Sequence, residues 1–147
     1  MINKVITLSE EREVSLTLYI HENYEEYQTG VTKPMIVVCP GGGYSFLSQR
    51  EAEPVAMKYY AAGFHAAVLR YGINEHAVFP GPVKDAAGCI SFLKDKADEW
   101  CIDRDNIFIT GFAIPTPISR YIFPSCFNKF GAFLAICSYA AVPLFFA

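Results

Sequence analysis

Three consecutive glycines, residues 41–43, follow a short apolar run and lie between Pro40 and Tyr44. Because glycine has no Cβ, the backbone N–H groups of such a turn stay accessible, and a bound molecule can approach them closely. Acyl-transfer enzymes use N–H groups of this kind to stabilise the oxyanion of a tetrahedral intermediate. A plain tight turn is the alternative interpretation. A phosphate-binding loop is disfavoured, because neither G-x-G-x-x-G nor G-x-x-x-x-G-K-[ST] occurs in the chain.

A second turn, residues 111–115, follows another apolar run but carries no nucleophile. A strand that ends in Gly-x-Ser-x-Gly presents a serine hydroxyl on a sharp turn, with small residues on both sides of it. In this chain Ala113 occupies the serine position and Pro115 occupies the second glycine position. Since Ala113 has no nucleophilic atom, the sequence predicts that this turn cannot attack an ester.

The remaining serines and histidines do not replace the missing nucleophile or its base. No Gly-x-Ser-x-Gly occurs elsewhere, and the serines after residue 113 lack a preceding strand and glycine turn. Of the histidines, His21 is expected to be solvated in an acidic loop, His65 is expected to be structural, and His76 is the candidate to border a pocket. In the chain order nucleophile, acid, base, the last two members come later, yet no His, Asp or Glu follows Ala113.

The elements that must position the two turns alternate between strands and helices. The apolar patterns predict strands at residues 4–8, 14–20, 35–39, 65–71 and 107–110, and helices at 51–62 and 83–100. Loops are expected at 21–33 and 72–82, and a turn at 103–106. Consecutive strand–helix–strand units imply a parallel sheet with helices on both faces. Since ligands bind beyond the carboxyl ends of such strands, both turns are expected at that edge.

Composition and charge exclude several classes of function. The formal net charge is −3 and Lys and Arg do not cluster, which disfavours a nucleic-acid partner. The five cysteines are odd in number and have no C-x-x-C spacing, so we expect reduced thiols and a cytoplasmic protein. We expect no signal peptide, no metal ion and no cofactor.

The composition changes abruptly near the second turn. All Asp and Glu residues lie at or before Asp105, and residues 130–147 carry no charge. An apolar stretch of about 18–20 residues can span a membrane, which leaves a membrane-associated tail as an alternative localisation. Pro143 and the lack of Lys or Arg at the C-terminal end argue against that anchor. We therefore treat residues 1–111 as part of one domain and residues 112–147 as an atypical apolar tail.

From about residue 14 to residue 112 the chain resembles the α/β-hydrolase superfamily, specifically small esterases related to acetyl-xylan esterases and the hormone-sensitive-lipase-like group. The resemblance rests on a collinear series of segments. They are VVCPGGGY at 37–44, REAEPVA at 50–56, AGFHAAVLRY at 62–71, FP at 79–80, and WCIDRDNI at 100–107 with GF at 111–112. This series is far more specific than any one motif within it.

The resemblance implies the N-terminal part of an α/β-hydrolase sheet, mostly parallel and incomplete at its C-terminal side. It implies a serine carboxylic-ester hydrolase whose oxyanion hole is formed by the amides of Gly42 and Gly43. Gly41 and Tyr44 are further candidates for the pocket, and the implied partner is a small acyl-ester substrate.

The resemblance also implies a serine at position 113 and a later acid and base, all of which this chain lacks. We therefore expect it to be inactive. A reading-frame disruption near codon 112 is the leading explanation, and it predicts that another frame encodes Ser-x-Gly-Gly followed later by Asp and His. The alternatives are a non-catalytic binding protein with the same fold and a membrane-tailed protein.

Overall fold

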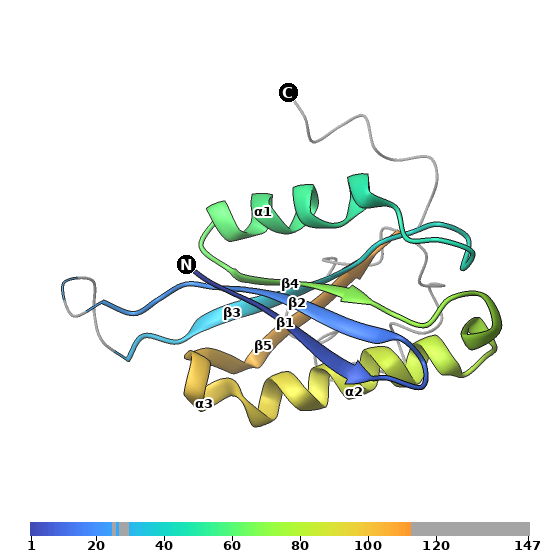
Figure 1. Cartoon of the computed structure of the whole chain (residues 1–147). Helices are drawn as coiled ribbons and strands as arrows, with labels where there is room; N and C mark the ends of the chain where they lie inside the picture. The colour runs from blue at the N-terminus through green and yellow to red at the C-terminus, as the bar shows by residue number, and fades with distance from the viewer. Residues whose placement is uncertain (25, 27–29, 113–147) are drawn as a thin grey trace.

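The computed structural model describes residues 1–24, 26 and 30–112. Within them, five strands form one sheet in the order β1-β2-β4-β3-β5. The strands are β1 Ile2–Ser9, β2 Val14–Ile20, β3 Lys33–Cys39, β4 His65–Arg70 and β5 Ile102–Gly111. The helices are η2 Gln49–Glu51, α1 Glu53–Ala61, η3 Asn74–Ala77, α2 Gly81–Asp95 and α3 Ala97–Trp100. Figure 1 shows α1 on one side of the sheet and α2 and α3 on the other.

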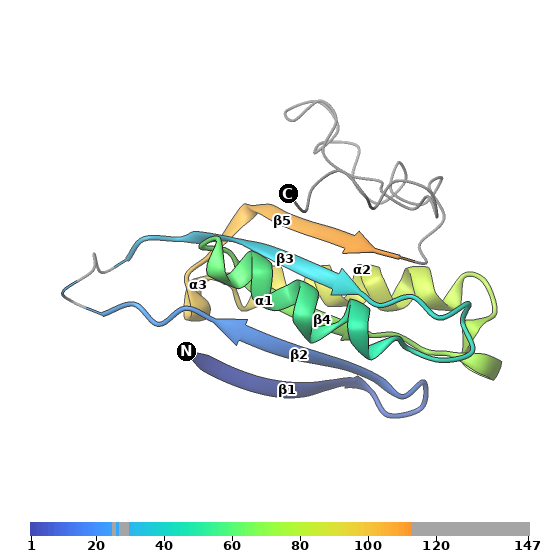
Figure 2. The ribbon, with the colours of Figure 1, turned by 90° about the horizontal axis from the view of Figure 1, so that it is seen from above.

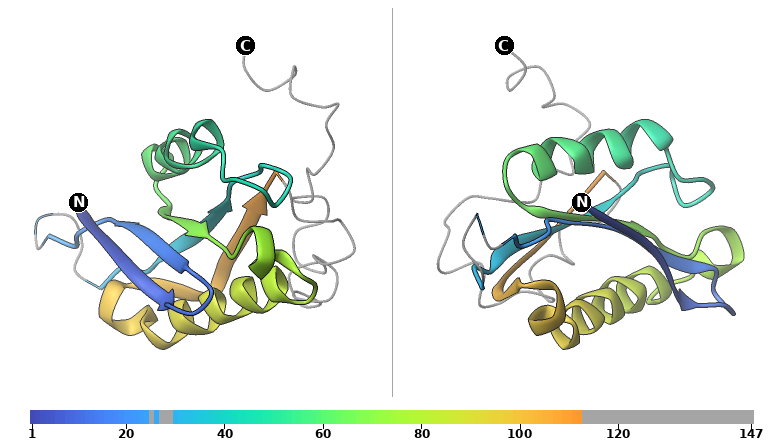
Figure 3. Two further views of the ribbon diagram at one scale, coloured as in Figure 1. Left: turned by 45° about the vertical axis from the view of Figure 1, so that its right-hand side comes forward. Right: turned by 60° about the vertical axis from the view of Figure 1, so that its left-hand side comes forward.

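The sheet is mixed, which refines the parallel sheet expected from the sequence. Strand β3 pairs in parallel with β4 and with β5. In contrast, β1 pairs antiparallel with β2, and β2 pairs antiparallel with β4. The short connection between β1 and β2 permits only a hairpin, because parallel neighbours require a long crossover connection. The α/β class and the helices on both faces are confirmed, as Figure 3 also shows from two sides.

Two apolar layers hold the helices against the sheet. On one face, Ala52 and Ala56 of the α1 region pack with the buried side chains of Val38 and Val68. On the other face, α2 contributes Cys89 and Leu93 among others to the larger cluster beneath β2, β3 and β4. Strands β3 and β4 are thus covered on both sides, which explains why they are continuous apolar runs and do not alternate.

The second helix begins earlier and ends earlier than predicted. It starts at Gly81, so Pro82 falls in its first turn, where the missing N–H removes no helical hydrogen bond. Residue Lys96 then separates α2 from the short α3, and the predicted single helix to residue 100 is wrong in this respect. The predicted loop at 72–82 is correspondingly shorter and contains η3.

The predicted turn at 103–106 is a bulge inside β5. The register of β3 with β5 shifts between Lys33 and Met35, and residues 103–106 lie opposite Pro34. Proline has no N–H to give to a ladder, so the partner strand departs from regular pairing there. The Asp103 carboxylate closes the bulge by accepting two local hydrogen bonds.

Strands β1 and β5 form the two edges of the sheet in the part of the chain that the structure describes (Figure 2). In the same part, no helix is both long enough and apolar enough to cross a membrane. The segment 130–147, which the sequence leaves as a candidate anchor, lies outside the described residues, as does Ala113.

Candidate functional site

The two turns singled out in the sequence lie at the same end of the sheet. Cys39, the last residue of β3, is paired with Gly111, the last residue of β5. The N–H of Phe112 donates to the carbonyl of Cys39 at 3.2 Å, so the two segments stay adjacent where they leave the sheet. The glycine turn at 41–43 therefore begins beside the C-terminal end of β5, the strand that leads to position 113. Ala113 itself lies outside the described residues.

Gly41 is fixed through both of its backbone polar groups. Its N–H donates to the Oε2 atom of Glu51 at 2.9 Å, and its carbonyl accepts the N–H of Ser48 at 2.8 Å. A Cβ at Gly41 would lie 2.7 Å from that Oε2 atom and 3.0 Å from the Cβ of Phe112. A side chain at this position would therefore have to move the Glu51 carboxylate from its hydrogen bond and press against Phe112.

Gly42 and Gly43 present N–H groups that have no acceptor within the part of the chain that the structure describes. Their φ angles are +148° and +61°, which side chains rarely adopt. The Gly42 carbonyl accepts the N–H groups of Ser45 and Phe46. In contrast, the N–H groups of Gly42 and Gly43 donate to no atom of residues 1–24, 26 or 30–112. Successive free amides at such a turn can bind an anion or a polarised oxygen.

Tyr44 ends this turn and is supported by two residues, Tyr71 and Asn74, that follow β4. Its ring packs edge-on against Tyr71, with ring centroids 5.9 Å apart. The Tyr71 hydroxyl donates to the Pro40 carbonyl at 2.7 Å, and the N–H of Asn74 donates to the Tyr44 carbonyl at 2.8 Å. Tyr71 therefore holds both ends of the turn, a role that the sequence did not reveal.

His76 is attached to a different set of groups. The His76 carbonyl accepts a hydrogen bond from Nη2 of Arg12 at 2.8 Å, and its ring lies 3.7 Å from the Glu75 carboxylate. None of the hydrogen bonds or ion pairs within the described residues joins the His76 ring to residues 41–44. The structure thus brings Gly41, Gly42, Gly43 and Tyr44 together, and places His76 in the neighbouring η3.

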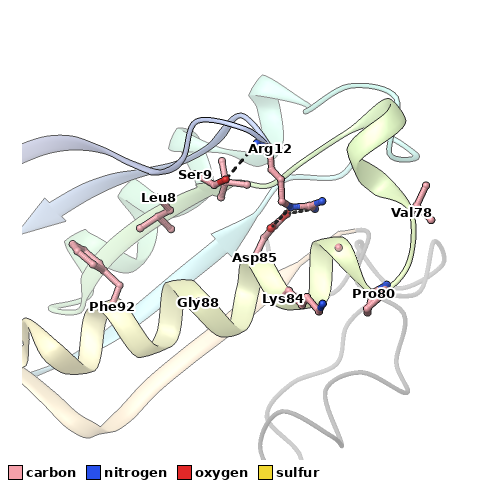
Figure 4. A pocket seen from close by; sticks show the side chains of 11 residues that line it. Leu8, Ser9, Arg12, Val78, Pro80, Lys84, Asp85, Gly88 and Phe92 are labelled. Carbon is pink, nitrogen blue, oxygen red and sulfur yellow. Dashed lines mark hydrogen bonds and ion pairs between the residues drawn. The ribbon is translucent and has the colours of Figure 1, made fainter.

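An ion pair between the partly exposed Arg12 and the buried Asp85 anchors the loop that carries His76. The Asp85 carboxylate, with a side chain only 5% exposed, accepts hydrogen bonds from Arg12 at 2.8 and 2.9 Å and from the N–H of Gly72 at 3.1 Å. The hydrogen bond to Asp85 raises the pKa of Arg12, so the guanidinium stays charged. Figure 4 shows this pair beside a groove between the β1–β2 hairpin and α2.

The groove in Figure 4 has a volume of about 560 Å³ and is lined in part by Leu8, Val14, Val78 and Phe92. Its lining includes none of Gly41, Tyr44 or His76, the residues expected to border a pocket. Three His, Cys, Asp or Glu side chains do not come together as metal ligands anywhere in the described part of the chain.

The other two histidines lie at the opposite end of the sheet. His65 is fully buried, accepts the N–H of His21 at Nδ1 and donates from Nε2 to the carbonyl of Cys101. Burial lowers the pKa of His65 to about 4, so its ring is neutral and structural, in agreement with the sequence-based expectation. The expectation that His21 is solvated is wrong, because its ring stacks on Tyr60 with centroids 3.8 Å apart. Burial lowers the pKa of His21 as well, with a further contribution from Lys33.

A family model named BD-FAE matches residues 19–114. Among the curated proteins, endo-1,4-beta-xylanase B of Butyrivibrio fibrisolvens is 29% identical over 102 residues. That alignment covers 67% of this chain and 15% of the xylanase.

Two solved structures extend the comparison. MGS-M1, an alpha/beta hydrolase enzyme from a Medee basin deep-sea metagenome library, is 44% identical with a TM-score of 0.73, covering 76% of this chain and 46% of that one. The acetyl ester-xyloside bifunctional hydrolase from Caldicellulosiruptor lactoaceticus is 28% identical with a TM-score of 0.65, covering 74% of this chain and 42% of that one. The chain thus spans less than half the length of these solved relatives.

Proposed function

The chain belongs to the BD-FAE family, and from that membership we propose that it keeps the oxyanion-binding turn of a carboxylic-ester hydrolase but does not hydrolyse esters. The resemblance to α/β-hydrolase esterases inferred from the sequence is confirmed by the family match and by the solved relatives. The activity of this particular chain is a separate matter, which depends on its own residues at the turn.

The observation that carries the proposal is the pair of N–H groups on Gly42 and Gly43, which have no acceptor among the described residues. They follow β3 directly and lie beside the end of β5, the strand that leads to position 113. In acyl transfer, two such donors stabilise the negative oxygen of the tetrahedral intermediate. Removing one of them typically raises the barrier by about 2.7–4 kcal/mol.

The absence of hydrolysis follows from residue 113. Alanine there has no oxygen or sulfur atom with which to attack an acyl carbon. Ester hydrolysis by this family of mechanisms needs a nucleophile, a base and oxyanion donors at one place. The turn at 41–44 supplies only the donors, so it serves as a binding site for the acyl carbonyl and not as a reaction centre.

The proposed ligand class is a small acyl ester of a carbohydrate. One relative is a xylanase, and another is an acetyl ester-xyloside bifunctional hydrolase, so acetylated xylose units connect the two. The two free N–H groups suit a single carbonyl oxygen, and no cofactor is required for such binding.

Calorimetric titration of the 147-residue chain with acetylated and deacetylated xylobiose tests this proposal. We expect the acetylated sugar to bind and the deacetylated sugar to bind at least about tenfold more weakly, because only the former offers an acyl oxygen. Acetate measured in the same sample should not increase. Equal affinity for the two sugars would contradict the role of the N–H pair, and release of acetate would contradict the role of Ala113.

A further inference from the structure

Glu51 lies at the turn and has no part in the chemistry described so far. We propose that Glu51 is a positioning residue, which binds the N–H of Gly41 so that only the next two N–H groups face a ligand oxygen. The inference rests on the proposed function, because it concerns the same turn, but it makes a claim of its own about which amide is withheld.

The geometry of residues 41–51 supports this role. The Glu51 carboxylate accepts the N–H of Gly41, and the N–H of Ser48 donates to the carbonyl of the same glycine. Glu51 is itself tied to Ser48, because its N–H donates to the Ser48 carbonyl at 3.2 Å. Glu51 and Ser48 therefore bind the two peptide units on either side of the Gly41 Cα: Glu51 binds the Pro40–Gly41 unit through its N–H, and Ser48 binds the Gly41–Gly42 unit through its carbonyl.

The three adjacent N–H groups of Gly41, Gly42 and Gly43 therefore have different roles. A hydrogen bond to a carboxylate is stronger than one to a neutral acceptor, so the N–H of Gly41 is not available to a ligand. The Gly42 N–H shares a planar peptide unit with the Gly41 carbonyl, which Ser48 binds, so Ser48 holds the Gly42 N–H while Glu51 occupies the Gly41 N–H. Without Glu51, the N–H of Gly41 would lose its acceptor and could compete for the ligand oxygen, although Tyr71 would still hold the same peptide unit through the Pro40 carbonyl.

The negative charge of Glu51 shows that this residue positions the turn and does not itself stabilise a bound oxygen. A carboxylate close to a developing oxyanion is repulsive, so the negative charge of Glu51 cannot itself favour the bound state. Glu51 acts instead through the position of its acceptor oxygen, which binds the N–H of Gly41. Glu51→Gln keeps an acceptor oxygen and removes the charge, whereas Glu51→Ala removes both and Glu51→Asp keeps the charge but withdraws the acceptor by one methylene group.

The test uses the full chain labelled with ¹⁵N-glycine, which gives a simple spectrum because the sequence has ten glycines. We expect the N–H of Gly41 to exchange with solvent at least about tenfold more slowly than those of Gly42 and Gly43, the size expected for a hydrogen bond to a charged group. Glu51→Ala and Glu51→Asp should abolish this difference, and Glu51→Gln should largely retain it. Gly63, whose N–H donates to the Tyr60 carbonyl, is the internal control and should not change.

A spectroscopic signature distinguishes the proposed contact from general loosening of the fold. The proton of the Gly41 amide, which is bound to the Glu51 carboxylate, should shift upfield in Glu51→Ala and Glu51→Asp, whereas the Gly63 amide should keep its position in all variants. Equal exchange at Gly41 in the unaltered protein and in Glu51→Asp would overturn the inference. Glu51→Asp provides this comparison even where Glu51→Ala does not fold.

Titration with sodium acetate separates the inference from the proposed function. We expect acetate to shift the Gly42 and Gly43 amides in the unaltered protein and in Glu51→Gln, with a smaller effect in Glu51→Asp. A protected Gly41 without any response to acetate would overturn the ligand-binding role of the turn and leave the role of Glu51 intact. An unchanged acetate response in Glu51→Asp would overturn the role of Glu51.

Discussion

Arg12 and Asp85 form a two-point ion pair across 73 residues of sequence, with Nε and Nη2 of the arginine 2.8 and 2.9 Å from the two carboxylate oxygens. The pair joins the β1–β2 hairpin to α2. Through the carbonyl of His76 and the N–H of Gly72 it also holds the loop that follows β4. The hairpin is therefore tied to the end of the sheet at which the glycine turn lies.

Arg12→Ala is expected to lower the free energy of unfolding by about 3 kcal/mol. The Asp85 side chain is only 5% exposed, and a buried carboxylate that loses its partner is strongly destabilising. Urea unfolding of the single and double variants with Asp85→Ala should show a coupling of at least about 1 kcal/mol between the two positions.

The surface pair Lys96–Glu99 is the matched control. Its side chains are 42% and 51% exposed, so Lys96→Ala should change the free energy of unfolding by less than about 1 kcal/mol. Equal effects of Arg12→Ala and Lys96→Ala would contradict the importance given to the Arg12–Asp85 pair.

His65 should make the protein less stable as the pH falls from about 6.5 to about 4. Its pKa is lowered to about 4 by burial, whereas an unfolded histidine titrates near 6.5. Below 6.5 the unfolded state binds a proton that the folded state does not, so acidification favours unfolding. The loss from this residue is at most about 3 kcal/mol.

The measurement is the difference in urea midpoint between pH 7 and pH 4.5 for the unaltered protein and for His65→Gln. Carboxylates contribute to the acid dependence of both proteins, so only the difference between them reports on His65. A steeper acid dependence in His65→Gln than in the unaltered protein would show that the neutral ring is not the cause.

Gly42→Ala and Gly43→Ala should differ although the residues are neighbours. A Cβ at Gly42 would lie 1.9 Å from the carbonyl oxygen of Phe46, so the turn must rearrange. A Cβ at Gly43 meets nothing within 4 Å, and only its φ of +61° is unfavourable. We expect a loss of about 1–2 kcal/mol for Gly43→Ala and a larger loss for Gly42→Ala, measured by thermal unfolding. The reverse order would mean that the turn is not packed as described.

The sequence predicts this fold best where its signal is local. Alternating residues identify β2 with its observed bounds, and the glycine at 63 marks the end of α1, with φ of +97°. The bulge opposite Pro34 and the break at Lys96 depend on neighbouring strands and helices, which no local pattern reveals. The turn that the sequence predicts at 103–106 is instead an irregular part of β5, which begins at Ile102.

At the candidate site, too, the sequence predicts the features that are local and misses those that depend on distant segments. The glycines at 41–43 and the alanine at 113 are visible as residue types in a motif. Glu51, Tyr71 and the Arg12–Asp85 pair act through contacts between segments that are distant in sequence. His21 was misjudged because the acidic residues around it do not show that its ring stacks on Tyr60.

Hydrolysis of p-nitrophenyl acetate by the purified 147-residue chain tests the central claim most directly. We predict a rate no higher than that of buffer and of an equal mass of albumin, since the donors of Gly42 and Gly43 act without a nucleophile at 113. Saturable, repeated turnover that disappears in Gly42→Ala would contradict it, because the same turn would then belong to a working active site.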